Sequence, residues 1–340
     1  MRNSLCFENK YISLHHQNPP SLLTMLKCAG RFIFRPMSTK IPYSKTYKSA
    51  EQLVPLLQSR GLFISDIVKA KQYLQTISHY RLSAYMHPLL AMPKSDNIYK
   101  SGSTFTQVMN LYRFDKKLRL LLFNEIEKIE IAIRTTIIDV CTDTYANPFW
   151  MTDKANFIAE SKYLKTMDLI NHEMERSHED FIVHFKTTYS NPYPPAWILS
   201  EILPLGVLTN LFLNLKNPQA KKRVAQRFGL QLPVFTSWLT IITLTRNACC
   251  HHARVWNKQN TITPMQPKKT SSPWIKIPVN SLRVYFNLCI VKYFLGIISP
   301  NNDMTEKLKT LLAAYPLVDT MAMGFPEGWE CEPLWLNKTI

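Results

Sequence analysis

The chain has 340 residues, of which 46% are hydrophobic and 19% are charged, and this composition excludes an intrinsically disordered protein. Lysine and arginine (41) outnumber aspartate and glutamate (24), so the formal net charge is +17. This excess favours a polyanionic partner, either nucleic acid or an anionic membrane surface, and the alternative is a merely basic soluble protein.

The N-terminal segment, residues 1–42, is expected to lie outside the folded domain. Its first 36 residues hold five basic residues and one acidic residue, and the short apolar run has no clean cleavage site after it. We interpret the segment as a disordered extension or as the product of a mis-assigned start codon, with Met37 as the first residue; a transit peptide is the alternative. The domain is therefore predicted over residues 43–340.

Helical periodicity dominates the rest of the chain. Residues 46–62 and 64–79 are each expected to form a helix, the second with Ser65-Asp66 as its N-cap, and with HYRLSAYMHPLL they make an N-terminal helical module over residues 43–92. From Leu111 to Ile137, apolar residues recur at intervals of 7, 4, 4, 3, 4 and 4. This stripe predicts one continuous helix from about Thr106 to Cys141, the spine of a helical bundle.

Further helices are expected at 160–186, 198–215, 220–230 and from 234 onward, followed by a proline-rich loop at 261–278 and a last buried helix pair. The most apolar stretch, 281–299, is interrupted by Arg283, Asn287 and Lys292, so we expect a buried helix and no membrane partner. The predicted fold class is all-α.

The segment LTRNACCHHARVWN (244–257) places two cysteines against two histidines. Consecutive helical residues point about 100° apart, so only Cys249 and His252 could share one ion, and two more ligands would have to come from elsewhere. We therefore predict no metal and no cofactor. The seven cysteines form no C-x-x-C pair and are odd in number, which indicates reduced thiols in a cytoplasm.

Catalysis is one interpretation of this segment, and close packing in a helix core is the other. Asn247 and His251 share a helix face, whereas Arg246 and His251 lie about 140° apart, a gap that a second copy of the helix could close. Arginine grips phosphate and histidine transfers protons near neutral pH. Cleavage of an RNA strand by its own 2′-hydroxyl needs both a phosphate-binding group and a proton-transfer group. We therefore predict Arg246, Asn247, His251 and His252 as the catalytic set.

The pattern R-N-x-x-x-H-H-x-R-x-W-N resembles the signature of the Abi-like abortive-infection proteins of bacteria, members of the HEPN superfamily. HYRLSAYMHP (79–88), LYRFDKKLRLLLFNEIEKIEIAIR (111–134), PPAWILSEILPLGVL (194–208) and MGFPEGWECEPLW (323–335) are also similar to family segments. His79 and Ala84 stand where the family usually has tyrosine and glycine. Neither departure touches the Arg–His motif at 246–252.

The resemblance implies a HEPN-like helical bundle, a homodimer with a composite active site, and a metal-independent endoribonuclease. It also implies a toxin-like role in phage defence, and some relatives are restrained by a small inhibitory RNA. Because some HEPN domains only bind, the alternative is a non-catalytic RNA-binding or regulatory dimer.

Other charged residues have plainer interpretations. The basic residues that could hold an RNA backbone, or equally form a solvated helix face, are Lys221, Lys222, Arg223, Arg227 and Arg254. Glu125, Glu127 and Glu130 are expected to form a solvated or salt-bridged face, and Glu201 could orient Arg246 or His251.

Overall fold

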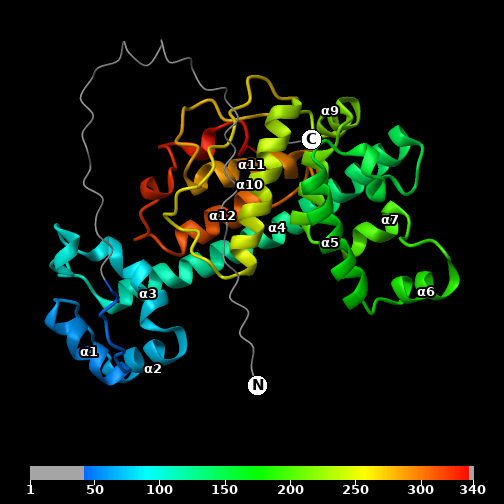
Figure 1. Cartoon of the computed structure of the whole chain (residues 1–340). Helices are drawn as coiled ribbons and strands as arrows, with labels where there is room; N and C mark the ends of the chain where they lie inside the picture. The colour runs from blue at the N-terminus through cyan, green and yellow to red at the C-terminus, as the bar shows by residue number, and fades with distance from the viewer. Residues whose placement is uncertain (1–41, 337–340) are drawn as a thin grey trace, which may run out of the picture. The chain divides into compact units, whose positions relative to one another are not determined.

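The structure, a computed structural model, describes residues 42–336. The prediction for residues 1–42 therefore lies almost wholly outside the described residues. The chain divides into a unit of residues 1–47, of which 42–47 have no regular secondary structure, and a unit of residues 48–340. The second unit contains all the helices described below (Figure 1).

The all-α prediction is confirmed: across residues 42–336 there are twelve α-helices, and β-pairing is limited to isolated bridges. Short 3₁₀ turns join several of the helices. The α-helices are α1 (Ala50–Ser59), α2 (Ile67–Ile77), α3 (His79–Met86), α4 (Phe105–Tyr145), α5 (Glu160–Arg176), α6 (Asp180–Thr188), α7 (Ala196–Leu199), α8 (Leu205–Asn214), α9 (Pro218–Arg227), α10 (Leu232–Cys250), α11 (Val284–Ile298) and α12 (Met304–Ala313).

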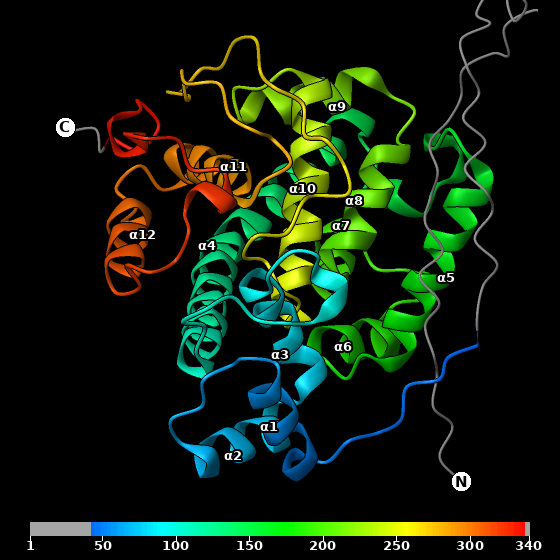
Figure 2. The same ribbon diagram turned by 90° about the vertical axis from the view of Figure 1, so that its left-hand side faces the viewer.

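Helix α4 is the spine that the apolar stripe predicted. Thr104 and Gln107 form a capping box at its start, and the helix continues for 41 residues, or roughly 60 Å. Every residue of the stripe from Leu111 to Ile137 is buried. Helices α10 and α11 pack directly on α4 (Figure 2). The stripe therefore forms the centre of the core.

Two predicted helices are each divided in the structure. Residues 160–186 form α5 and α6, because the backbone is extended at Ser177 and at Glu179. Residues 198–215 form α7, a 3₁₀ turn and α8, because Pro204 disfavours helical geometry at Leu203, which is extended. Periodicity in the sequence continues across both breaks, so it does not reveal them.

Helix α3 packs on α4, α2 packs on α3, and α1 packs on α2. Arg113 of α4 also donates to the Tyr73 hydroxyl of α2. The Asp66 side chain caps α2 by accepting from Lys69 N, as the sequence predicted. No single helix between residues 42 and 336 has both the length and the apolarity to cross a bilayer. Helices α9 and α10 have this length and apolarity only when they are taken together, and the pair is bent by 70°. Nine of the 19 residues of α10 are buried in the core.

Candidate functional site

The Arg–His motif lies at the C-terminal end of α10. Asn247 O accepts the N–H of His251 at 2.9 Å, so His251 closes the last helical turn. The next two N–H groups close back on the helix, from His252 to Cys249 O (3.2 Å) and from Ala253 to Ala248 O (2.9 Å). These two bonds form a Schellman motif, in which His252 takes the left-handed position (φ +54°) that usually belongs to glycine.

The two histidines consequently differ in their backbone setting. His251 continues the helical turn above Asn247, as the spacing predicted, whereas His252 has left the helix. Both imidazoles are exposed. Neither they nor the Asn247 amide has a side-chain hydrogen-bond partner among residues 42–336, so all three are open to a ligand or a second subunit.

Arg246 is oriented by a carboxylate of the central helix. Its Nε donates to Glu130 Oε2 at 3.2 Å, and Glu130 Oε1 accepts from Arg134 at 3.1 Å. The Arg246 side chain keeps 29% of its exposure, and within the described chain its two terminal nitrogens have no partner. Glu130 thus fixes one edge of the guanidinium and leaves the other edge for an anion.

Glu201, which the sequence suggested as an orienting group, does not contact Arg246; it is exposed near α6. The expectation of a salt-bridged acidic face on α4 holds for Glu125 and Glu130. Glu125 is buried and pairs with Lys128 and Lys307. Glu127 is exposed.

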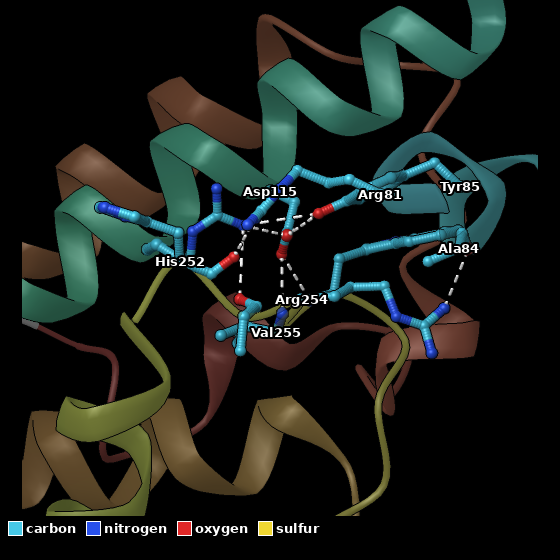
Figure 3. Close-up of polar contacts among 10 residues, drawn as sticks. Arg81, Ala84, Tyr85, Asp115, His252, Arg254 and Val255 are labelled. Carbon is cyan, nitrogen blue, oxygen red and sulfur yellow. Dashed lines mark hydrogen bonds and ion pairs between the residues drawn. The ribbon is translucent and has the colours of Figure 1, made fainter. Parts of the chain in front are cut away.

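A buried polar network anchors the segment that follows the histidines (Figure 3). Asp115, which is fully buried, accepts from Val255 N (3.0 Å) and Trp256 N (2.6 Å) through Oδ1. Its Oδ2 accepts from Tyr85 Oη at 2.5 Å and forms an ion pair with Arg119. Burial, reinforced by the charge on Asp115, raises the pKa of Tyr85, so its hydroxyl remains a donor.

Helix α3 clamps the same segment from its other side. Arg81 Nη1 donates to His252 O at 2.7 Å, and Arg254 Nη1 donates to Ala84 O at 3.1 Å. The ring of Tyr85 stacks on Trp256. The clamp therefore joins the HYRLSAYMHP segment to the Arg–His motif, although these segments are far apart in the sequence (Figure 3).

Asp115, Arg119 and Tyr85 were not predicted as site residues, and Glu130 was expected only as part of a solvated or salt-bridged face. The sequence did contain an indication of the first two. Asp115 and Arg119 are spaced i, i+4 within the apolar stripe of α4, where burying charged side chains is costly unless they are paired and hydrogen-bonded. Glu130 gave no such signal. Its partner Arg246 is 116 residues away.

The two cysteines at the motif differ in burial: Cys249 is buried and Cys250 is half-buried. Burial raises the pKa of the Cys249 thiol to about 12, so the thiol stays protonated and packs as a small apolar group. Across residues 42–336 no three histidine, cysteine, aspartate or glutamate side chains converge in a way that could hold a metal ion.

The five basic residues predicted to hold RNA are in different settings. Arg223 binds Asp143 and Thr144, and Lys221 donates to Leu213 O and Leu215 O. These contacts, like the Arg254 clamp, hold parts of the fold together. Lys222 and Arg227 are exposed on α9 and have no side-chain partner in the described part of the chain.

The structure thus defines an all-α protein in which an Arg–Asn/His motif at a helix end is held between a central helix and an N-terminal helical segment. The family model for the Abi-like protein matches residues 72–257, more than half of the chain. The chain therefore belongs to the Abi-like family. The match includes α3, α4 and α10, which are the elements that build the clamp and the motif. No curated protein and no solved structure matches the chain.

Proposed function

We propose that this protein is a metal-independent endoribonuclease of the abortive-infection type, acting in the cytoplasm against phage as a toxin-like member of the HEPN superfamily. Family membership supports the role in abortive infection. The observation that carries the chemistry is the end of α10, where half-buried Arg246, whose two terminal nitrogens have no partner among residues 42–336, is followed five residues later by exposed His251.

In the proposed reaction, the RNA 2′-oxygen attacks the adjacent phosphorus. His251 takes the 2′-hydroxyl proton, and Arg246 neutralises the phosphate oxygens as negative charge develops. The bond from phosphorus to the 5′-oxygen breaks, and that oxygen leaves with a proton taken from water. The products are a 2′,3′-cyclic phosphate and a 5′-hydroxyl. Asn247 lies on the same helix face as His251 and orients either this general base or the ribose of the RNA.

Two copies of the chain would supply the complete set of groups. Arg246 and His251 diverge on their own helix, and the exposed apolar side chains Leu120, Phe123 and Ile131 run along α4 beside the motif. Two contacts show where this exposed face lies. Consecutive helical residues point about 100° apart, so Leu120 and Ile131 lie about 100° around α4 from Arg119, which contacts Ala253, and from Glu130, which binds Arg246. A homodimer through this face brings two motifs together.

The test is cleavage of RNA by the purified protein in EDTA, with analysis of the product ends. Wild type should cut RNA to cyclic phosphate ends and leave DNA intact. Arg246→Ala and His251→Ala should each lose on the order of 100- to 10,000-fold in rate. Cleavage that needs a divalent ion would overturn the mechanism. RNA binding without any cleavage would instead favour a non-catalytic RNA-binding dimer.

A further inference from the structure

Charge is distributed very unevenly along the chain. Between Glu201 and Asp303 there are thirteen lysines and arginines and no aspartate or glutamate, so this stretch contributes 13 − 0 = +13 to the formal +17. Its helices α8 and α11 are mostly buried, and the one basic residue of α10, Arg246, pairs with Glu130. The exposed positive charge therefore falls on α9, on Lys216 just before it, and on the loop from residue 251 to residue 283, which contains no helix.

A groove lies where this loop passes the start of α10. It has a volume of about 820 Å³. One side is formed by α9 with Lys222 and Gln226, and the other by the loop with Lys269, Thr270 and Ser271. The turn from Gly229 to Pro233 forms its floor.

The two sides of the groove are fixed to each other. Ser271 N donates to Gly229 O at 3.4 Å, which joins the loop to the turn that follows α9, and the hydroxyl of Tyr293 on α11 donates to Phe228 O at 3.2 Å, which holds this turn on the core. A side chain on Gly229 would not fit, because its Cβ would collide with the Ser271 hydroxyl. The groove is therefore a built feature of the fold and needs no rearrangement before binding.

We propose that this groove binds the phosphate backbone of RNA, as a second contact of the substrate that the proposed ribonuclease cuts. Lys222 and Lys269 are exposed and have no side-chain partner among residues 42–336, and the lining includes no acidic residue. Amide and hydroxyl groups, such as those of Gln226 and Thr270, hydrogen-bond phosphate and sugar. An anionic membrane is the poorer fit, because the lining lacks the aromatic side chains that insert into lipid.

The groove and the motif lie at opposite ends of α10. Figure 2 shows α9 near one end of this helix and α3, which clamps His252, near the other. The helix has 19 residues, so the separation is roughly 28 Å. At about 3.4 Å per nucleotide for a stacked strand, a run on the order of eight nucleotides spans this distance, and a more extended strand needs fewer. This inference depends on the proposed function only for the cut; binding in the groove is testable alone.

The experiment measures affinity for a labelled, unstructured 20-nucleotide RNA as a function of salt. Lys222→Glu/Lys269→Glu should bind about tenfold more weakly, and its salt slope should fall by roughly one to two. Lys69→Glu/Lys162→Glu is the control, because it makes the same charge change at exposed lysines outside the groove. Lys222→Gln/Lys269→Gln should show a smaller loss in the same direction.

Where cleavage occurs, the groove variant should raise KM and leave kcat unchanged, because the groove is remote from the reacting phosphate. Wild-type affinity and salt slope in the groove variant would overturn the proposal, and so would an equal loss in the control. Weaker binding to anionic vesicles with RNA binding intact would assign the groove to membranes. Weaker RNA binding by a protein that never cuts RNA would support the groove and reject the ribonuclease.

Discussion

At the scale of single residues, Asp115 connects the central helix to the motif. It accepts two backbone N–H groups and the Tyr85 hydroxyl while it pairs with Arg119, and both members of this ion pair are buried. Asp115→Asn removes the charge that balances the Arg119 guanidinium. We expect it to lower the free energy of unfolding by about 3 kcal/mol.

Tyr85→Phe is the matched control for Asp115→Asn, because it removes one neutral donor from the same network and should cost about 1 kcal/mol. Urea unfolding of both variants measures the difference. Equal losses would show that the carboxylate charge is not what holds the segment after the histidines.

His252 occupies a backbone position in which glycine is free of strain. Its φ of +54° costs a non-glycine residue roughly 1 kcal/mol, so His252→Gly should leave stability unchanged or raise it by up to about that amount. If His251 is the base, this variant should also keep most of its cleavage. Thermal unfolding and a cleavage assay together test both statements. A dead His252→Gly beside an active His251→Ala would exchange the roles of the two histidines.

At the scale of elements, the turn between α9 and α10 requires glycine for two reasons. Gly229 has a φ of +60°, and any Cβ there collides with Ser271. Gly102 has a φ of +77°, but a Cβ added there would meet nothing within 4 Å, so it shares only the first reason. Gly229→Ala should therefore destabilise the protein by more than the roughly 1 kcal/mol expected for Gly102→Ala. Equal unfolding midpoints for the two variants would mean that the loop at Ser271 can move away from the added Cβ with no loss of stability.

The elements also show what the sequence could and could not predict. The stripe from Leu111 to Ile137 predicted α4 because helical periodicity is a local property. The residue at which α10 ends was harder to predict, because His252 stands where a Schellman motif usually has glycine. The Glu130–Arg246 pair was beyond prediction, because it depends on how two distant helices pack. The positions of Arg246 and His251 on α10 followed from spacing, whereas their partners came from the tertiary structure.

At the scale of the whole molecule, the exposed apolar face of α4 formed by Leu120, Phe123 and Ile131 is the proposed dimer face. Leu120 and Ile131 each keep 58% of their exposure there. Leu120→Glu/Ile131→Glu should give a monomer in light scattering at micromolar concentration, because like charges would meet across a two-fold axis. Leu164→Glu/Leu169→Glu on α5 is the control and should leave the dimer intact. A monomeric wild type that still cuts RNA would contradict the composite site.

Mixing two inactive variants decides whether the site is shared between subunits. If Arg246 of one subunit works with His251 of the other, a mixed dimer of Arg246→Ala and His251→Ala chains contains one intact site. Random exchange makes half of the dimers mixed, so about a quarter of wild-type cleavage should return. If the two residues act within one chain, neither variant supplies a complete pair and mixing restores nothing. A return of activity that Leu120→Glu/Ile131→Glu abolishes would place the shared site on the α4 face.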